Sequence, residues 1–134
     1  MGAWGYKPFE NDTSLDQLYD FLETLLKSPQ TRSFIKGYVS TLLDIQNQEE
    51  SCLLMGVAMV DASINKSDLD ILGDISAYNV LYHLPKLTEL IPQALEVLDY
   101  LIAQGVDDWA DAVQQDRMNL YYTYKKRLSG TYDN

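Results

Sequence analysis

Closely spaced aspartates are the side chains of this sequence that come nearest to a pattern for binding or catalysis. Asp68, Asp70 and Asp74 follow one another, with a glycine before the third. Aspartates at the first and third places and a glycine at the sixth are typical of a calcium-binding loop. The fifth place is Leu72 and the twelfth is Asn79, where such a loop needs an oxygen ligand and a bidentate glutamate. The pattern therefore predicts a solvated acidic loop, and no metal or other cofactor is expected.

A second acidic group, Asp107, Asp108 and Asp111, stands at the start of the last helix that the sequence predicts. Helix N-termini favour acidic residues, because these cap free backbone N–H groups and complement the helix dipole. Paired carboxylates can also serve general acid–base catalysis, but that use needs a cleft and shifted pKa values, which no pattern here indicates. We therefore expect no catalytic residue in this group.

Nucleophilic catalysis lacks its usual residues in this chain. His83 is the only histidine, Cys52 is the only cysteine, and no G-x-S-x-G motif occurs. Cys52 lies in the most apolar segment, where a buried thiol is unreactive. A lone cysteine excludes an internal disulfide and fits a reducing compartment, and the N-terminus does not have the pattern of a secretory signal. A cytoplasmic, non-enzymatic protein is the simplest interpretation.

Residues 121–127 combine tyrosines with Lys125, Lys126 and Arg127, a mixture that can bind single-stranded nucleic acid. The chain has 10 Lys and Arg against 20 Asp and Glu, so its formal charge is −10. Such a charge repels phosphate backbones and anionic lipid surfaces, and no apolar run is long enough to span a bilayer. Neither nucleic acid nor a membrane is expected as a partner. Instead, Tyr124 is expected in the core, with the three cations at the C-terminal end of a helix closed by Gly130.

The spacing of the apolar residues predicts the helices that would position these groups. The predicted helices cover about 15–28, 31–45, 49–64, 75–82, 87–104 and 107–128. Segment 49–64 is apolar on nearly every side, which indicates a buried central helix. We expect one all-α domain over residues 1–134, an irregular bundle of five to six helices around segment 49–64. Gly37 in the second helix indicates close packing against a neighbour there.

The first twelve residues carry a distinct box of glycines and aromatic side chains, G-A-W-G followed by F-E-N-D. The glycines allow the backbone to turn tightly around the indole of Trp4. Asn11 and Asp12 are suited to satisfying backbone donors where the chain enters the first helix. We interpret Trp4, Phe9, Asn11 and Asp12 as a structural clasp, and a ligand pocket under Trp4 is the alternative.

This box, with Asp16 shortly after it, resembles the DUF4259 family of bacterial proteins. The apolar helix preceded by acids, 50–62, and the late helix that opens with Trp109 are consistent with that family. The resemblance implies a small, mainly helical bacterial domain. It carries no established function and no catalytic residues with it.

The acids are expected to form a distributed coat with two denser patches, within residues 68–74 and 107–111, that are candidates for partner binding. An acidic surface without catalytic groups favours a basic protein as partner. The leading hypothesis is a non-enzymatic protein-binding domain, such as a bacterial immunity protein that neutralises a basic toxin, or a regulator. Two alternatives remain open: a divalent-cation-binding or carboxylate-based enzyme domain, and a helical homodimer with a structural role. The chain is expected as a monomer or a homodimer.

Overall fold

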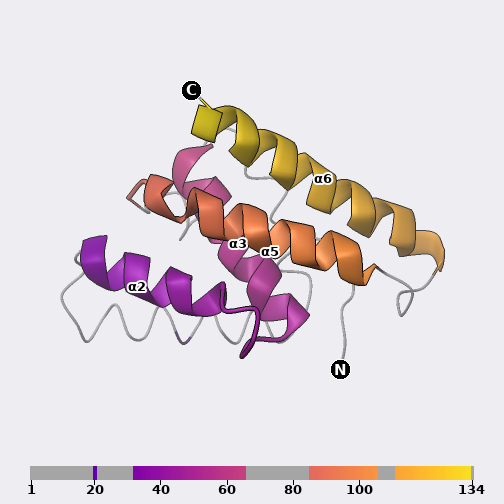
Figure 1. The fold of residues 1–134 in the computed structure, drawn as a ribbon, viewed down its shortest axis with the longest axis horizontal. Coiled ribbons are helices and arrows are strands. Elements are labelled where there is room, and N and C mark those ends of the chain that lie inside the picture. The colour runs from indigo at the N-terminus through magenta and orange to yellow at the C-terminus, as the bar shows by residue number, and fades with distance from the viewer. Residues whose placement is uncertain (1–19, 21–31, 66–84, 106–110, 134) are drawn as a thin grey trace.

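The computed structural model describes residues 20, 32–65, 85–105 and 111–133 (Figure 1). These stretches form four α-helices, α2 (Arg32–Leu42), α3 (Glu50–Ile64), α5 (Ile91–Gln104) and α6 (Asp111–Asp133), and a 3-10 turn, η2 (Thr88–Leu90). No strand occurs among the residues so described. The predicted all-α class is therefore confirmed. The helices expected over 15–28 and 75–82 fall almost wholly outside the described residues, so the count of five to six helices stays a prediction.

Helix α3 is the centre of the described bundle, as the sequence predicts. It contacts α2, α5 and α6, and in Figure 1 it passes behind α5. Every residue from Cys52 to Ser63 is buried, because this segment is apolar around its whole circumference and loses little by facing neighbours on all sides. Within the described stretches, no helix is both long enough and apolar enough to cross a membrane.

Helix α5 packs one apolar face against α3 and α6. Its buried side chains recur at helical spacing: Ile91, Ala94, Val97, Leu98 and Leu101. The predicted helix 87–104 is confirmed, except that its start is the separate 3-10 turn η2 and the α-helix begins with a proline in its first turn. Proline suits that place because its missing N–H would have no partner there in any helix. Gly105, with a positive φ of 79°, ends the helix as expected.

Helix α2 ends at Leu42, earlier than the predicted residue 45. The chain turns just beyond it, where Leu43 N–H donates to Ser40 O and Asn47 N–H donates to Asp44 O. The carboxylate of Asp44 also accepts hydrogen bonds from the Gln46 N–H and from Asn47 Nδ2. Aspartate favours turns because its side chain binds nearby backbone donors in this way. The hydrogen bonds of Asp44, Gln46 and Asn47 therefore stop the helix that the apolar spacing extends.

Gly56 in α3, and not Gly37 in α2, is the glycine at a close helix contact. A Cβ atom added at Gly56 would lie 2.8 Å from Leu43 Cδ2 and 3.1 Å from Leu42 Cβ. At Gly37 the same atom would meet no described residue within 4 Å. The expectation for Gly37 is therefore wrong, because that residue lies on the exposed side of α2, and the close approach of α2 and α3 depends on Gly56.

Helix α6 runs to Asp133, so Gly130 lies within it and does not close it, contrary to the prediction. The last turn contains no basic residue. The cations at 125–127 therefore do not serve the C-terminal dipole. Two of them form ion pairs instead, Lys125 with Asp99 of α5 and Arg127 with Asp61 of α3. Tyr124 is fully buried, as predicted.

Candidate functional site

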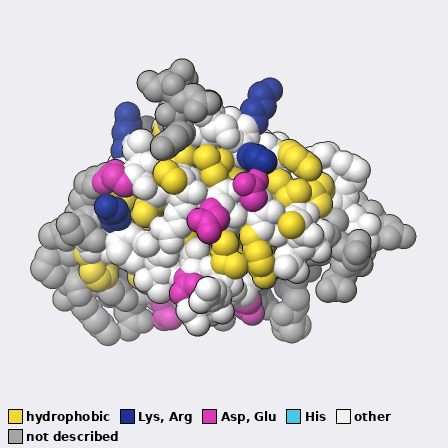
Figure 2. All heavy atoms as spheres, viewed as in Figure 1, with side chains coloured by type: hydrophobic (Ala, Val, Ile, Leu, Met, Phe, Trp, Pro, Cys, Tyr) yellow, Lys and Arg dark blue, Asp and Glu magenta, His cyan; other side chains and the backbone are white. Residues whose placement is uncertain are grey.

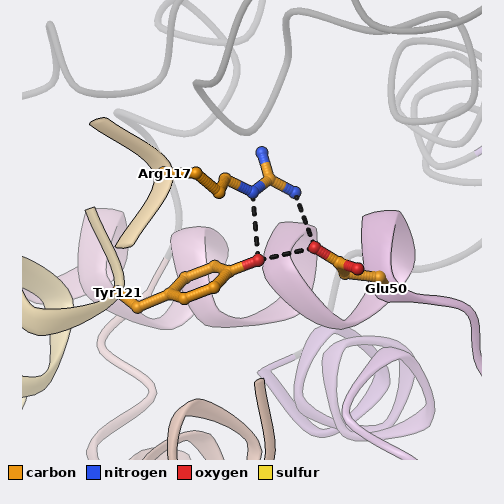
Figure 3. Close-up of polar contacts among 3 residues, drawn as sticks. All are labelled: Glu50, Arg117 and Tyr121. Atoms are coloured by element: carbon orange, nitrogen blue, oxygen red, sulfur yellow. Dashed lines mark hydrogen bonds and ion pairs between the residues drawn. The ribbon is translucent and has the colours of Figure 1, made fainter. Parts of the chain in front are cut away.

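The contact between α3 and α6 contains the main buried polar groups of the described structure. At its first end, Tyr121 Oη donates to Glu50 Oε1 over 2.6 Å, and Arg117 Nε donates to the same Tyr121 Oη over 3.0 Å (Figure 3). Arg117 Nη2 completes the triangle at 3.5 Å from Glu50 Oε1. The Arg117 guanidinium also lies over the Tyr121 ring, 5.5 Å from its centroid. One hydroxyl thus joins a cation and an anion from two helices.

This triangle has the chemistry of a structural bridge. Burial raises the pKa of Tyr121 above its usual value, and the hydrogen bond to Glu50 raises it as well, although Arg117 acts in the opposite direction. The hydroxyl therefore keeps its proton at neutral pH and donates it in the hydrogen bond to Glu50. A general base or nucleophile would need the opposite shift. The arrangement holds α3 against α6 and offers no activated group.

A second polar contact closes the other end of the same interface. Arg127 Nη2 lies 2.8 Å from Asp61 Oδ2, and Asn65 Nδ2 donates to Asp61 Oδ1 over 2.8 Å. Asp61 follows Glu50 on α3 as Arg127 follows Arg117 on α6, so the two helices run in the same direction. At about 1.5 Å of rise per residue, the two contacts are about 16 Å apart along the helices. They fix both the register and the direction of α6 on α3.

Sequence reasoning missed these residues, although the chain held a signal for each. Asp61 ends a run of apolar residues in the helix predicted to be central, and a carboxylate in such a place needs a cation or hydrogen bonds from a neighbour. Arg117 falls in step with the buried positions 120, 121, 124 and 128 of α6, so its side chain had to point inward. The helical spacing of these positions, considered without regard to polarity, predicts that Arg117 is buried.

A groove of about 490 Å³ lies where the end of α2 and the turn after it meet α5. It is lined by Ser40, Thr41, Leu43, Asp44, Ile45, Gln46, Gln93 and Glu96. Two reciprocal hydrogen bonds cross it: Ser40 Oγ donates to Gln93 Oε1 over 3.2 Å, and Gln93 Nε2 donates to Ser40 O over 3.3 Å. Among the described residues, the lining combines hydroxyls, amides and two carboxylates, without a cation. Sequence reasoning did not single out this set, because its members are far apart in the chain.

The candidate residues from the sequence fall mostly outside the described part of the chain. This is the case for the clasp, Trp4, Phe9, Asn11 and Asp12, and for five of the acids, Asp68, Asp70, Asp74, Asp107 and Asp108. Asp111 is the first residue of α6, and the structure places its backbone only. Neither acidic patch is therefore tested as a binding surface.

The single cysteine and the possible metal ligands also bear on catalysis. Cys52 is free and buried, and burial raises the pKa of its thiol, with Glu49 adding to the effect. A thiol with a raised pKa is a poor nucleophile at neutral pH. Within the described stretches, no group of three or more His, Cys, Asp or Glu residues is placed to hold a metal ion.

Comparison with known proteins gives one match. No curated protein and no solved structure matches the sequence significantly. One family model does, and its description is "Domain of unknown function (DUF4259)". Its match extends from the N-terminal box, where the resemblance was noted, into α6 and thus includes α2, α3 and α5. Since residues 2–119 of the 134 are matched, the chain belongs to the DUF4259 family.

Proposed function

We propose that this chain is a non-enzymatic, acidic protein-binding domain that docks a basic partner, in the role of a bacterial immunity protein or of a regulator. Its site of action is the cytoplasm, which a single free cysteine fits. Its scaffold is the bundle of five to six helices that the sequence predicts. The observation that carries the proposal is the way in which the chain uses its few cations.

Four cations of the described residues are paired with acids of the same chain: Lys36 with Glu89, Arg117 with Glu50, Lys125 with Asp99 and Arg127 with Asp61. The whole chain has 10 cations for 20 acids. Each internal pair removes one of each, so the acids that remain outnumber the remaining cations by more than two to one. The charge offered to a partner is therefore more one-sided than the composition suggests.

The acidic side chains of the described residues are spread over the face seen in Figure 2. Figure 2 shows them scattered over the face that α5 forms, with hydrophobic side chains between them. A distributed field of one sign attracts a partner of opposite charge and speeds its association, while apolar contacts supply most of the affinity. This combination supports docking of a basic protein better than it supports a reaction confined to one cleft.

The polar side chains that are buried also support a non-enzymatic role. Arg117, Tyr121 and Asp61 are engaged across the α3–α6 interface. Their hydrogen bonds and charges hold two helices in register, which gives them a structural use. We therefore assign no catalytic residue to this chain.

The proposal is tested by capture of partners from the native host on the immobilised chain at low and at high salt, with identification by mass spectrometry. We expect a basic protein that is retained at low salt and released at high salt, because exposed charges are screened beyond about 10 Å at 0.1 M salt. Three variants locate the docking face. One carries Asn at positions 68, 70 and 74, a second carries Asn at 107, 108 and 111, and Asp116→Asn is the control for loss of exposed charge.

The proposal fails if no partner is retained at low salt, or if the retained partner is acidic. Loss of binding in one triple variant, with Asp116→Asn unchanged, would assign the docking face to that patch. Calorimetry with calcium, magnesium and manganese addresses the cation-binding alternative, for which heat of binding is the expected sign. Light scattering addresses the homodimer, which predicts twice the chain mass.

A further inference from the structure

Three sources of negative potential converge on the groove between α2 and α5. Asp44 and Glu96 contribute two carboxylates to its lining. The C-terminal end of α2 adds the partial negative charge of the helix dipole, and this helix has no basic residue in its last turn to balance it. Among the described residues that line the groove there is no Lys or Arg, so the potential that these groups create favours a cation.

Glu96 differs from the two acids that flank it along η2 and α5. Glu89 lies 3.8 Å from Lys36 Nζ, and Asp99 lies 2.8 Å from Lys125 Nζ. Glu96 is exposed and, within the described parts of the chain, forms no such pair. The acids on either side are thus neutralised by the chain itself, while the carboxylate that lines the groove is left to bind a cation from elsewhere.

On the other side of the groove, hydrogen bonds fix the orientation of the Asp44 carboxylate. The Gln46 N–H donates to its Oδ1 over 3.1 Å, and Asn47 Nδ2 donates to its Oδ2 over 2.6 Å. An ionised carboxylate has about four lone-pair sites, so each oxygen can accept one more hydrogen bond. These contacts fix the orientation of the carboxylate without neutralising its charge, and a carboxylate already oriented loses little entropy when it binds a cation.

We propose that this groove binds an arginine side chain of the basic partner, a proposal that rests on the function put forward above. The two carboxylates and the hydroxyl and amide oxygens of the lining suit the five donors of a guanidinium better than the three of an ammonium. Ile45, which is partly exposed, supplies apolar surface for the methylene stem of an arginine. A volume of about 490 Å³ accommodates that side chain together with flanking backbone.

The test is an NMR titration of the full chain with the blocked tripeptide acetyl-Gly-Arg-Gly-amide and with the same peptide containing citrulline, the neutral isostere of arginine. We expect the arginine peptide to shift the amide signals of residues 40–46 and 93–96, and the citrulline peptide to leave them in place. Glu96→Gln is expected to weaken binding about tenfold, the loss of one charge-assisted hydrogen bond. Asp99→Asn removes the same charge from the same helix outside the groove, and is expected to change binding less than about twofold.

Equal binding of the citrulline peptide, or equal losses in Glu96→Gln and Asp99→Asn, would overturn the proposal, since either result means that the groove does not recognise a guanidinium. A lysine peptide that binds as tightly as the arginine peptide would overturn it as well. The proposed function fails separately. A captured basic partner whose binding ignores Glu96→Gln would leave that function standing without this groove. Binding of the arginine peptide without any captured partner would leave the groove as an arginine site and remove the proposed function.

Discussion

The two ends of α3 are joined to α6 by ion pairs of opposite layout. At the first turn of α3, the Glu50 side chain is 39% exposed and its cation, Arg117, is 1% exposed. Near the last turn, the anion, Asp61, is 1% exposed and Arg127 is 17% exposed. Each pair therefore has one member that water can reach and one that it cannot, but the roles of acid and base are exchanged between the two ends.

The geometry of the two ends follows from this difference. The buried Asp61 is in direct contact with Arg127 at 2.8 Å and accepts a further hydrogen bond from Asn65. The buried Arg117 is 3.5 Å from Glu50, and the Tyr121 hydroxyl fills the space between them. A buried charge needs compensation from its neighbours, whereas an exposed one can be solvated. The cost of removing a residue should thus depend on which partner is left behind.

Arg127→Met is expected to have the largest effect, a loss of about 3 kcal/mol or more in the free energy of unfolding, because it leaves a buried carboxylate without its cation. Asp61→Asn should cost less, about 2 kcal/mol, because the guanidinium left behind is partly exposed. Urea denaturation followed by circular dichroism measures both. Equal losses would show that exposure does not set the cost at this end.

The order of acid and base should reverse at the other end. Glu50→Gln is expected to cost about 2 kcal/mol, because it takes the carboxylate from a buried guanidinium. Arg117→Met leaves an acid that water can reach and should cost about 1 kcal/mol. The same denaturation experiment gives both values. A greater loss for Arg117→Met than for Glu50→Gln would contradict the comparison.

A packing defect in the middle of α3 should lower the free energy of unfolding less than the loss of a buried charge partner at the ends of that helix. Gly56→Ala is expected to destabilise by about 1 kcal/mol, since overpacking against Leu42 and Leu43 outweighs the gain in helix propensity. Gly37→Ala, in open space on α2, is the matched control and should stabilise by about 0.5 to 1 kcal/mol. Thermal unfolding of the two variants should therefore shift in opposite directions. A shift of the same sign in both would remove the role given to Gly56.

The sequence could predict what depends on local spacing. The buried helix 49–64 follows from its continuous apolar run, and the helix over 87–104 follows from the spacing of its apolar residues. It could not predict what depends on which helices meet. Both Gly37 and Gly56 lie inside predicted helices, and the crossing of α2 and α3 shows which of them is at the helix contact.

The same limit applies to the charges and to the groove. In the sequence, Arg127 is interpreted as a cation near the end of a helix. The structure shows that α6 continues past Arg127 and that Asp61 lies beside it. The groove brings together residues 40–46 and 93–96, and no spacing rule joins positions so far apart. Position within a helix was therefore predictable, whereas partners across helices were not.

The last effect concerns the hydroxyls of Tyr38 and Tyr121, whose loss of protons changes stability only in alkaline solution. Burial raises the pKa of Tyr38 to about 12, with Asp20 and Cys52 adding to it, and the pKa of Tyr121 is raised by burial as well. An unfolded chain loses these protons near pH 10, while the folded chain keeps them. Folding is therefore favoured fully below pH 10, and stability falls as the pH rises from about 10 through 12.

Phenylalanine variants separate the two hydroxyls. Tyr121→Phe should lower stability at pH 8, because it removes the link between Glu50 and Arg117, but should then lose less than the wild type between pH 8 and pH 11. Tyr38 lies on α2 and is not part of that link, so Tyr38→Phe should reduce the alkaline loss and leave the order of acid and base at the Glu50 end unchanged. Urea midpoints at the two pH values measure both variants. If Tyr121→Phe keeps the wild-type loss at pH 11, the Tyr121 hydroxyl ionises at the same pH in the folded and the unfolded chain, and the bridge at the Glu50 end does not raise its pKa.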